Sequence, residues 1–452
     1  MVGIAQRLTR RRVLGLGAAA AVAGSLGPGA LRVAAESLVG AGEGPSGGSS
    51  TVATAASTRV LYRGCAIADG RSATRRAAQS ILVENGRVSW IRPTDAEEDP
   101  GPTTGLQIVD SHALTAVPGM VDAHCHLTSP GGKRYIERFS DPPRQLLQTA
   151  ERNGSLARQS GAAWLRDAGS PTVVDPIGGQ RRALALGIRD RWANRDDRPS
   201  VAAAGTWIAA PGGLESGLGV VVRDAGEMVA AANLQLDQGA DLVKLYVESR
   251  SGHDSPWTAA EIRRVVDAVH GRGARVTAHA MWLKTARAAI LGGVDAIEHG
   301  FHLDADACAE MARRGTYLVS TLIVPRNWLR LGTTTSGTFW STRAGKRYAR
   351  NMLAAGEDSV AIARQNGVKI AAGTDFGGGS PRAGQLAWEV ESLVAAGMQP
   401  WQGLGAATWR GGDLLGNADA GRIREGGPAD FFLVDGDPLS DPAALWNVAR
   451  LA

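Results

Sequence analysis

Apolar and polar positions alternate with two different periods along the central part of the chain, between residues 116 and 374. Short runs rich in Val, Ile, Leu and Ala predict buried strands bounded by polar or glycine-rich turns. The eight predicted strands lie at 116–124, 162–166, 201–206, 242–247, 275–279, 296–299, 317–321 and 369–374. Amphipathic stretches between them predict helices, for instance at 225–238 (with Asp224 as N-cap), 258–272, 283–291, 305–313 and 347–365.

Strands that alternate with helices favour a parallel sheet joined by crossover helices. Eight such units are the content of a (β/α)8 TIM barrel, an α/β fold that we predict for residues 116–420. The alternative is an open doubly wound sheet. No glycine-rich phosphate-binding fingerprint follows an early strand, so the barrel is favoured.

The two ends of this region carry shorter strand patterns. Predicted strands at 60–62, 80–83 and 87–91 include a hairpin turn at Glu84-Asn85-Gly86, and others lie at 421–423 and 429–434. Neither end is long enough to bury much apolar surface alone. We therefore predict that residues 59–115 and 421–452 pair into one small β-sandwich.

The first residues have the pattern of a targeting segment. Arg10-Arg11-Arg12 precedes an apolar, Ala/Gly-rich run that extends to Leu31. This pattern predicts a twin-arginine signal over residues 1–35, followed by a flexible linker at 36–58. A membrane anchor is the alternative, although the run is short and glycine-rich for a span. Export to the periplasm, cell surface or medium by the twin-arginine machinery is expected.

The composition is that of a globular protein: 452 residues, 44% hydrophobic, 21% charged, with a net charge of +5. No basic stripe is interleaved with aromatic residues, so nucleic acid is not an expected partner. Three scattered cysteines do not form a disulfide framework, and Cys125 is expected to be a small buried hydrophobe.

Residues that can ligate metals recur at the ends of the predicted strands. His124 and His126 are two residues apart, so on a strand their side chains face the same way. Further candidates follow on later strands: Lys244, His279, His299 and Asp375. The carboxyl ends of barrel strands are where such folds place their chemistry. Each residue alone has a structural alternative, and only the joint pattern is specific.

This order of residues resembles the amidohydrolase superfamily of metal-dependent hydrolases, in particular its imidazolonepropionase-like and Xaa-Pro or Xaa-Arg dipeptidase-like branch. The similar segments are 117–126 (VPGMVDAHCH), 296–300 (AIEHG), 314–322 (RGTYLVSTL), 372–375 (AGTD) and 426–439 (GGPADFFLVDGDPL). The resemblance extends over residues 59–445.

The resemblance implies two divalent metal ions, expected to be zinc. His124, His126 and Asp375 would hold one ion, and His279 and His299 the other, with carboxylated Lys244 as the bridging ligand. The alternative for Lys244 is a buried salt bridge. Asp375 would also be the general base for a metal-activated hydroxide.

Substrate contacts are harder to predict because they lie in loops. Tyr246 shares a face with Lys244, His302 follows His299, Arg382 lies in the loop after Asp375, and Trp328 follows the seventh strand. These four are the candidate substrate-binding residues. The structural alternatives are a core tyrosine for Tyr246, a helix cap for His302 and a solvated surface arginine for Arg382. The chain departs from the branch at Leu214 and Ser380-Pro381, where relatives often have histidine.

We predict an enzyme that hydrolyses a C–N amide bond of a small molecule, either a dipeptide or an N-acyl amino acid. Alternatives are a lactone, ester or cyclic-amide hydrolase on the same site, and a non-catalytic scaffold or binding protein. A deaminase is disfavoured because no carboxylate follows His279 in Ala280-Met281-Trp282. A homo-oligomer is expected.

Overall fold

The computed structural model describes residues 58–452 except 98, 102–104, 177, 215–216 and 250. The predicted signal segment and nearly all of the predicted linker lie outside the described residues. Within the described part of the chain, no helix has the length and apolar character needed to cross a bilayer.

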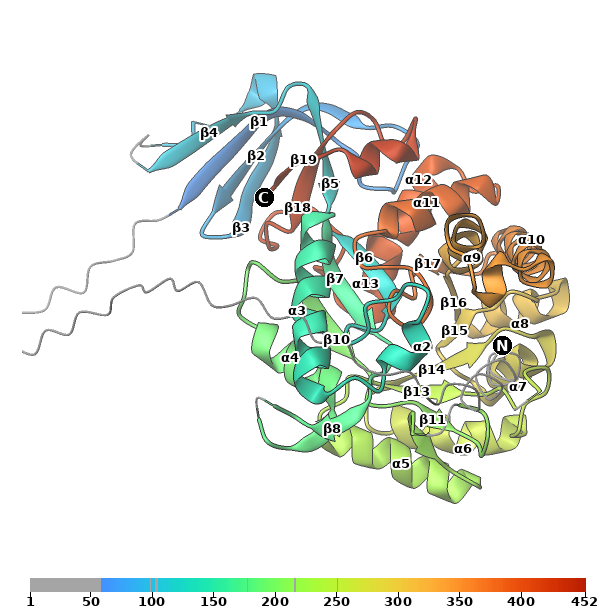
Figure 1. Cartoon of the computed structure of the whole chain (residues 1–452). Coiled ribbons are helices and arrows are strands. Elements are labelled where there is room, and N and C mark those ends of the chain that lie inside the picture. Colours follow the sequence, from blue (N-terminus) through green and yellow to red (C-terminus); the bar gives the residue numbers. More distant parts are fainter. Residues whose placement is uncertain (1–57, 98, 102–104, 177, 215–216, 250) are drawn as a thin grey trace, which may run out of the picture.

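Eight parallel strands form the predicted barrel (Figure 1). They are β6 (Met120–Cys125), β7 (Ala162–Asp167), β10 (Ser200–Ala203), β13 (Leu242–Tyr246), β14 (Arg275–Ala280), β15 (Ala296–His299), β16 (Tyr317–Ser320) and β17 (Ile370–Ala372). Two isolated parallel bridges, Ala204–Leu242 and Cys125–Phe376, join the two runs of strands at their ends. The second bridge places the segment after β17 beside β6.

Helices pack around the strands, as the alternating pattern predicts. They are α2 (Tyr135–Arg138), α3 (Pro143–Gln159), α4 (Leu184–Trp192), α5 (Ala225–Asp237), α6 (Ala259–His270), α7 (Leu283–Gly292), α8 (Ala305–Arg314), α9 (Ile323–Thr334), α10 (Arg343–Gln365), α11 (Leu386–Ala395), α12 (Pro400–Ala406) and α13 (Trp409–Leu415). Asp224 accepts a hydrogen bond from Glu227 N, which confirms it as the N-cap of α5.

Strands from both chain ends hydrogen-bond into one mixed sheet beside the barrel (Figure 1). They are β1 (Arg59–Ile67), β2 (Arg76–Glu84), β3 (Arg87–Pro93), β4 (Leu106–Asp110), β5 (Leu114–Pro118), β18 (Phe431–Asp435) and β19 (Val448–Leu451). The strand predicted at 421–423 is wrong, because this segment runs through turns and irregular backbone. The remaining short elements are β8 (Thr172–Val174), β9 (Arg181–Ala183), β11 (Ile208–Ala209), β12 (Val220–Val221), η1 (Thr94–Ala96), η2 (Phe339–Ser341) and η3 (Pro442–Trp446).

The apolar run predicted as a single first strand, 116–124, is divided between the two sheets. β5 pairs antiparallel with β18 in the small sheet, whereas β6 belongs to the barrel. The break is at Gly119, whose backbone N–H donates to Asp430 O at 2.7 Å. A Cβ there would lie 2.5 Å from the Cβ of Ala163, so only glycine allows this close passage. Hydrophobicity is continuous across the break, so the sequence pattern does not show it.

Two neighbouring phenylalanines on β18 pack into the cores of the small sheet and of the barrel. Phe431 packs in the core of the small sheet, with its ring centroid 5.0 Å from that of Tyr62. Phe432 points the other way and belongs to the main core of the barrel.

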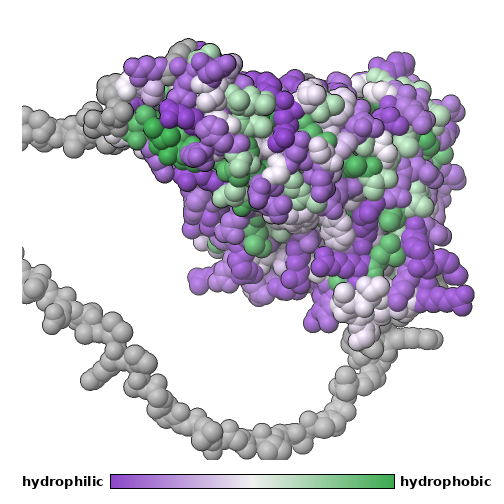
Figure 2. Space-filling model, turned by 90° about the horizontal axis from the view of Figure 1, so that it is seen from above, coloured by the Kyte–Doolittle hydropathy of each residue, from purple (hydrophilic) through white to green (hydrophobic). Residues whose placement is uncertain are grey.

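The face of the molecule shown in Figure 2 is mostly polar, with apolar side chains in small groups.

Replacing Phe432 by alanine tests this attachment. The side chain is fully buried, so we expect the substitution to lower the free energy of unfolding by about 3–5 kcal/mol. Urea denaturation would measure this change. Leu234→Ala is the control, because Leu234 is 57% exposed on α5 and should change stability by less than about 0.5 kcal/mol. Equal effects of the two substitutions would show that Phe432 does not hold the sheets together.

Candidate metal centre and active site

The predicted ligands all lie at the carboxyl ends of barrel strands, on β6, β13, β14 and β15 and just after β17. This rim holds His124, His126, Lys244, His279, His299 and Asp375. All six line one cavity, and most of their surface is buried. The structure therefore brings together at one site residues that are up to 251 positions apart in the sequence.

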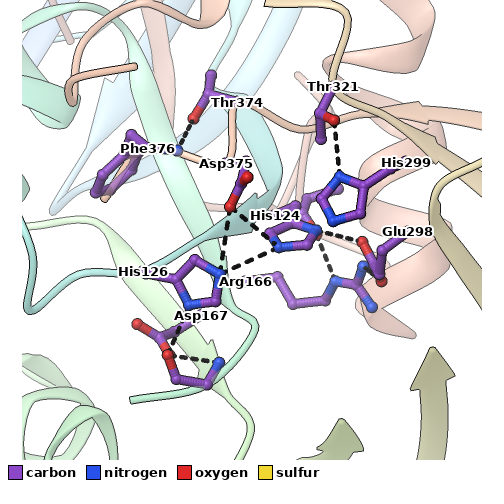
Figure 3. A network of polar contacts seen from close by, with 12 residues as sticks. His124, His126, Arg166, Asp167, Glu298, His299, Thr321, Thr374, Asp375 and Phe376 are labelled. Carbon is purple, nitrogen blue, oxygen red and sulfur yellow. Dashed lines mark hydrogen bonds and ion pairs between the residues drawn. The ribbon is translucent and has the colours of Figure 1, made fainter. Parts of the chain in front are cut away.

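Three of these residues point their ligand atoms at one another (Figure 3). His124 Nε2 lies 3.3 Å from His126 Nε2, and Asp375 Oδ1 lies 3.5 Å from the first and 3.3 Å from the second. Ligands at about 2.0–2.1 Å from a tetrahedral ion are about 3.3–3.4 Å apart. The spacing of the three atoms therefore fits a single divalent cation.

Hydrogen bonds fix which nitrogen of each ring faces this point. His124 Nδ1 lies 2.6 Å from Glu298 Oε2, and His126 Nδ1 lies 2.7 Å from Gly169 O. Both partners are acceptors, so each Nδ1 carries the proton and each Nε2 has a lone pair when the ring is neutral. Burial lowers the pKa of His124 to about 4, which keeps this ring neutral. Three electron-rich atoms thus converge on one point, an arrangement that a cation would stabilise.

A second group of candidate ligands lies beside the first. The His299 ring centroid is 4.9 Å from that of His124 and 4.7 Å from that of His279. Lys244 Nζ and His279 Nε2 are both buried, and neither makes a hydrogen bond within the part of the chain that the structure describes. Within the described residues, His279 and His299 do not complete a group of three with another histidine, cysteine or carboxyl side chain. Of the residues that the sequence predicted as ligands, Lys244 is the one left to supply a third ligand for a second ion.

Glu298 is the central residue of the surrounding network, and sequence reasoning missed it. Its buried carboxylate accepts hydrogen bonds from Arg166 and Thr277 in addition to its contact with His124. Burial alone would raise its pKa, but the charges of Arg166 and Lys244 and the hydrogen bond from His124 outweigh this and hold the pKa far below its usual range. This carboxylate orients His124.

Strand alternation predicts that only one of the neighbours Glu298 and His299 faces the barrel interior. Both contribute to the site because His299 has a left-handed backbone, with φ of +72°. Its Nδ1 lies 2.9 Å from Thr321 Oγ1. Asp375 is the other candidate ligand with a left-handed backbone, with φ of +51°. Residues other than glycine keep a left-handed backbone only where surrounding contacts hold it. Here this backbone turns the side chains of His299 and Asp375 into the site.

Glycines leave room at the point where the ligands converge. A Cβ on Gly378 would lie 2.5 Å from His126 Nε2 and 2.4 Å from Asp375 Oδ1. The backbone after β17 is also held close to β6, because Asp375 N donates to His124 O at 2.7 Å. Any side chain at position 378 would therefore compete with a bound ion for the same space.

The six ligands open into a cavity of about 670 Å³. Of the predicted substrate-binding residues, Tyr246 and Trp328 line it. Tyr246 stacks on His279, with ring centroids 4.0 Å apart. Leu214, at one of the positions where the chain departs from the resembling branch, also lines the cavity and adds apolar surface.

The other two predicted substrate contacts do not line this cavity. His302 stacks on Trp282 with a centroid separation of 4.3 Å. Arg382 is exposed, and its backbone N–H donates to Gln385 Oε1. The predictions for both residues relied on their nearness in sequence to a ligand, which does not determine side-chain direction in a loop.

The sequence argument against deamination also needs correction. It considered only the residues after His279, but Glu248, which follows β13, places Oε2 3.3 Å from His279 Nε2. Glu248 Oε1 accepts a hydrogen bond from Met281 N at 2.6 Å, which fixes the carboxylate in place. A carboxylate near this histidine is therefore present, contributed by the preceding strand.

Comparison with known proteins adds independent information. A family model described as "Amidohydrolase family" matches residues 115–451. An uncharacterised protein of Mycobacterium tuberculosis is 32% identical over 333 residues, which cover 73% of this chain and 81% of that protein. Imidazolonepropionase of Salinispora tropica is 26% identical over 390 residues, with coverages of 79% and 85%. A solved Xaa-Pro dipeptidase with bound methionine superposes with a TM-score of 0.75 at 25% identity, with coverages of 86% and 97%.

Replacing Gly378 by alanine tests the assignment of the metal position. The added Cβ would intrude between His126 and Asp375, so we expect loss of the ion they share and of nearly all activity, with the fold retained. Metal content after dialysis and circular dichroism would measure the two effects. Gly178→Ala is the control, because its Cβ would meet nothing closer than 3.5 Å. Unchanged metal content in the Gly378 variant would place the ion elsewhere.

Proposed function

The chain belongs to the amidohydrolase family of metal-dependent hydrolases acting on C–N bonds, and we propose that its substrate is a dipeptide or an N-acyl amino acid. The convergence of His124, His126 and Asp375 at the floor of the cavity carries this proposal. The likeness to a Xaa-Pro dipeptidase structure over 97% of that chain supports the dipeptide-like size of the substrate.

The proposed chemistry is hydrolysis at the amide carbonyl. His124, His126 and Asp375 would hold a divalent ion, which would supply water of lowered pKa, toward about 7, and would polarise the substrate carbonyl. Burial alone would raise the pKa of Asp375, but its contact with His126 and the nearby His124 and Lys244 lower it. Asp375 is therefore a carboxylate at neutral pH. It can take a proton from the attacking water and pass it to the leaving nitrogen.

We propose that Lys244 is carboxylated. Burial lowers the pKa of its amine to about 8, with Glu298 opposing this effect, so about a tenth of the amine is unprotonated at pH 7. The neutral amine can add to CO2, forming an N–C bond with loss of a proton. The product is an anion with two oxygens. It would supply the third ligand that His279 and His299 lack and would remove the unpaired ammonium.

Cyclic amides are the second candidate class of substrate. The chain resembles an imidazolonepropionase over 79% of its length. The cavity also lacks a buried arginine to bind a free carboxylate, because its lining cations other than Lys244 and the histidines are the exposed Lys133 and Arg134. A neutral ring would not need such a partner.

Amino-acid release from a panel of dipeptides and N-acyl amino acids tests the proposal. We expect the zinc-loaded full chain to hydrolyse members of the panel, and we expect a chelator to abolish turnover and added metal to restore it. Asp375→Asn is the inactive control. A panel without turnover, in protein shown to contain metal, would contradict the proposal, and activity on cyclic amides would then support the second class.

Replacing Lys244 by methionine tests the carbamate. We expect about half of the bound metal and most of the activity to be lost, because the variant keeps the apolar stem without the bridging oxygens. Lys284→Met is the matched control, since Lys284 is exposed and pairs with Asp254. Labelled bicarbonate should give a carbamate carbon signal by NMR in the parent protein alone. Full metal content and rate in the Lys244 variant would refute the modification.

A further inference from the structure

The wall of the cavity is unusually aromatic. Nine phenylalanine, tyrosine and tryptophan side chains line it, among them three of the five tyrosines in the chain. Two groups of them lie beside different ligands. Phe139 and Trp207 lie beside His126, with centroids 6.0 and 5.4 Å from its ring. The second group lies beyond His299 and Phe301, whose rings are 5.9 Å apart.

The second group comes from the segment between β16 and β17. Trp328 of α9 and Trp340 of η2 stack in parallel, with centroids 4.4 Å apart and an interplanar angle of 6°. Tyr348 of α10 completes this group, 6.1 Å from Trp328. We call Trp328, Trp340 and Tyr348 the aromatic pocket. Flat, rigid walls of this kind favour a planar ligand, because aromatic rings pack best in offset or edge contacts.

Two hydrogen-bond donors in the aromatic pocket have no partner. Trp328 Nε1 and Tyr348 Oη are both buried and make no hydrogen bond with the rest of the described chain. Burial raises the pKa of Tyr348 well above its usual value, so its hydroxyl keeps its proton. Buried donors usually have partners, and a donor without one is costly to maintain. Because both residues line the cavity, a ligand in the cavity can supply the missing acceptor.

The charge distribution limits what this ligand can be. The lining residues Lys133, Arg134 and Glu137 are exposed, and Arg134 pairs with Glu137. The three side chains of the aromatic pocket are neutral, and the charge that acts on Tyr348 is the carboxylate of Glu248, so the pocket offers no counter-charge to a carboxylate. A neutral acceptor group therefore fits the two free donors without leaving a buried charge unpaired.

We propose that the aromatic pocket selects substrates with a neutral, planar aromatic group that carries a hydrogen-bond acceptor. This rests on the proposed amide hydrolysis and narrows the substrate class to aroyl amides of amino acids. Trp328 and Tyr348 are the specificity-determining residues. Their rings pack on the aromatic group, and Nε1 or Oη donates to its acceptor.

Isosteric substrates separate the two parts of this proposal. N-(2-naphthoyl)-L-alanine tests the planar group, and a series of quinolinecarbonyl-L-alanines adds one acceptor by replacing a ring CH with nitrogen at successive positions. N-acetyl-L-alanine lacks the ring. We expect kcat/KM for the naphthoyl substrate to exceed that for the acetyl substrate at least a hundredfold. At least one quinoline isomer should exceed the naphthoyl substrate by about tenfold.

Variants that remove a donor and keep a ring identify the residue responsible. Trp328→Phe or Tyr348→Phe should abolish the tenfold gain of that quinoline isomer over the naphthoyl substrate, measured as the ratio of the two kcat/KM values in the same variant. Tyr317→Phe is the control, because Tyr317 begins β16 at the opposite end of the barrel. Equal losses on both aromatic substrates in the two pocket variants would overturn the role of the donors.

The outcome also separates this inference from the proposed function. Hydrolysis of N-acetyl-L-alanine as fast as the naphthoyl substrate would overturn the aromatic preference and leave amide hydrolysis intact. If no acyl amino acid is hydrolysed, the proposed function fails, and calorimetry with uncleaved quinolinecarboxamides still decides the pocket. Binding that is weakened about tenfold in Trp328→Phe or Tyr348→Phe would support the pocket, and equal or absent binding in parent and variants would overturn it.

Discussion

The site depends on holding three electron-rich atoms within 3.5 Å of one another in a buried space. His124 Nε2, His126 Nε2 and Asp375 Oδ1 repel one another unless a cation lies among them. The surrounding structure opposes that repulsion. Glu298 and Gly169 fix the two rings through their Nδ1 atoms, and a hydrogen bond from its own backbone N–H to His124 O holds Asp375. Metal affinity and local rigidity are therefore linked, because the same contacts that orient the ligands resist their separation.

Closure of the barrel is what makes this convergence possible. Asp375 follows the last strand and His124 ends the first, so the two meet only when the sheet curls onto itself at the Cys125–Phe376 bridge. Asp122 reinforces this junction by accepting hydrogen bonds from both Thr374 N and Thr374 Oγ1. Burial raises the pKa of Asp122 to about 7 in spite of these donors. A closed barrel also has no free edge there, so the register between the first and last strands is fixed and the ligand spacing with it.

Chemistry and selectivity are carried by different parts of the molecule. The ligands come from strand ends, which the barrel holds rigidly, whereas the aromatic pocket comes from the α9–α10 segment inserted between β16 and β17. The strand ends and the inserted segment meet at Phe301. The ring of Phe301 lies beside His299, and it is also close to α10, since a Cβ added at Gly356 would contact it. Changes in the inserted segment can therefore alter which substrate fits without moving the ligands.

The sequence by itself determined the barrel, the order of its strands and the six residues that meet at its rim, because periodicity and strand ends are local features that a parallel barrel converts into one shared edge. It did not show the division of the first apolar run at Gly119, since hydrophobicity is continuous there. It missed Glu298, because strand alternation allows only one of the neighbours Glu298 and His299 to face the barrel interior, and Glu248, which reaches His279 from the preceding strand. It also named His302 and Arg382 as candidate substrate contacts, although neither lines the cavity. Only the tertiary structure decided these points, because each depends on a distance between segments that are far apart in sequence or on a backbone conformation that local patterns do not specify.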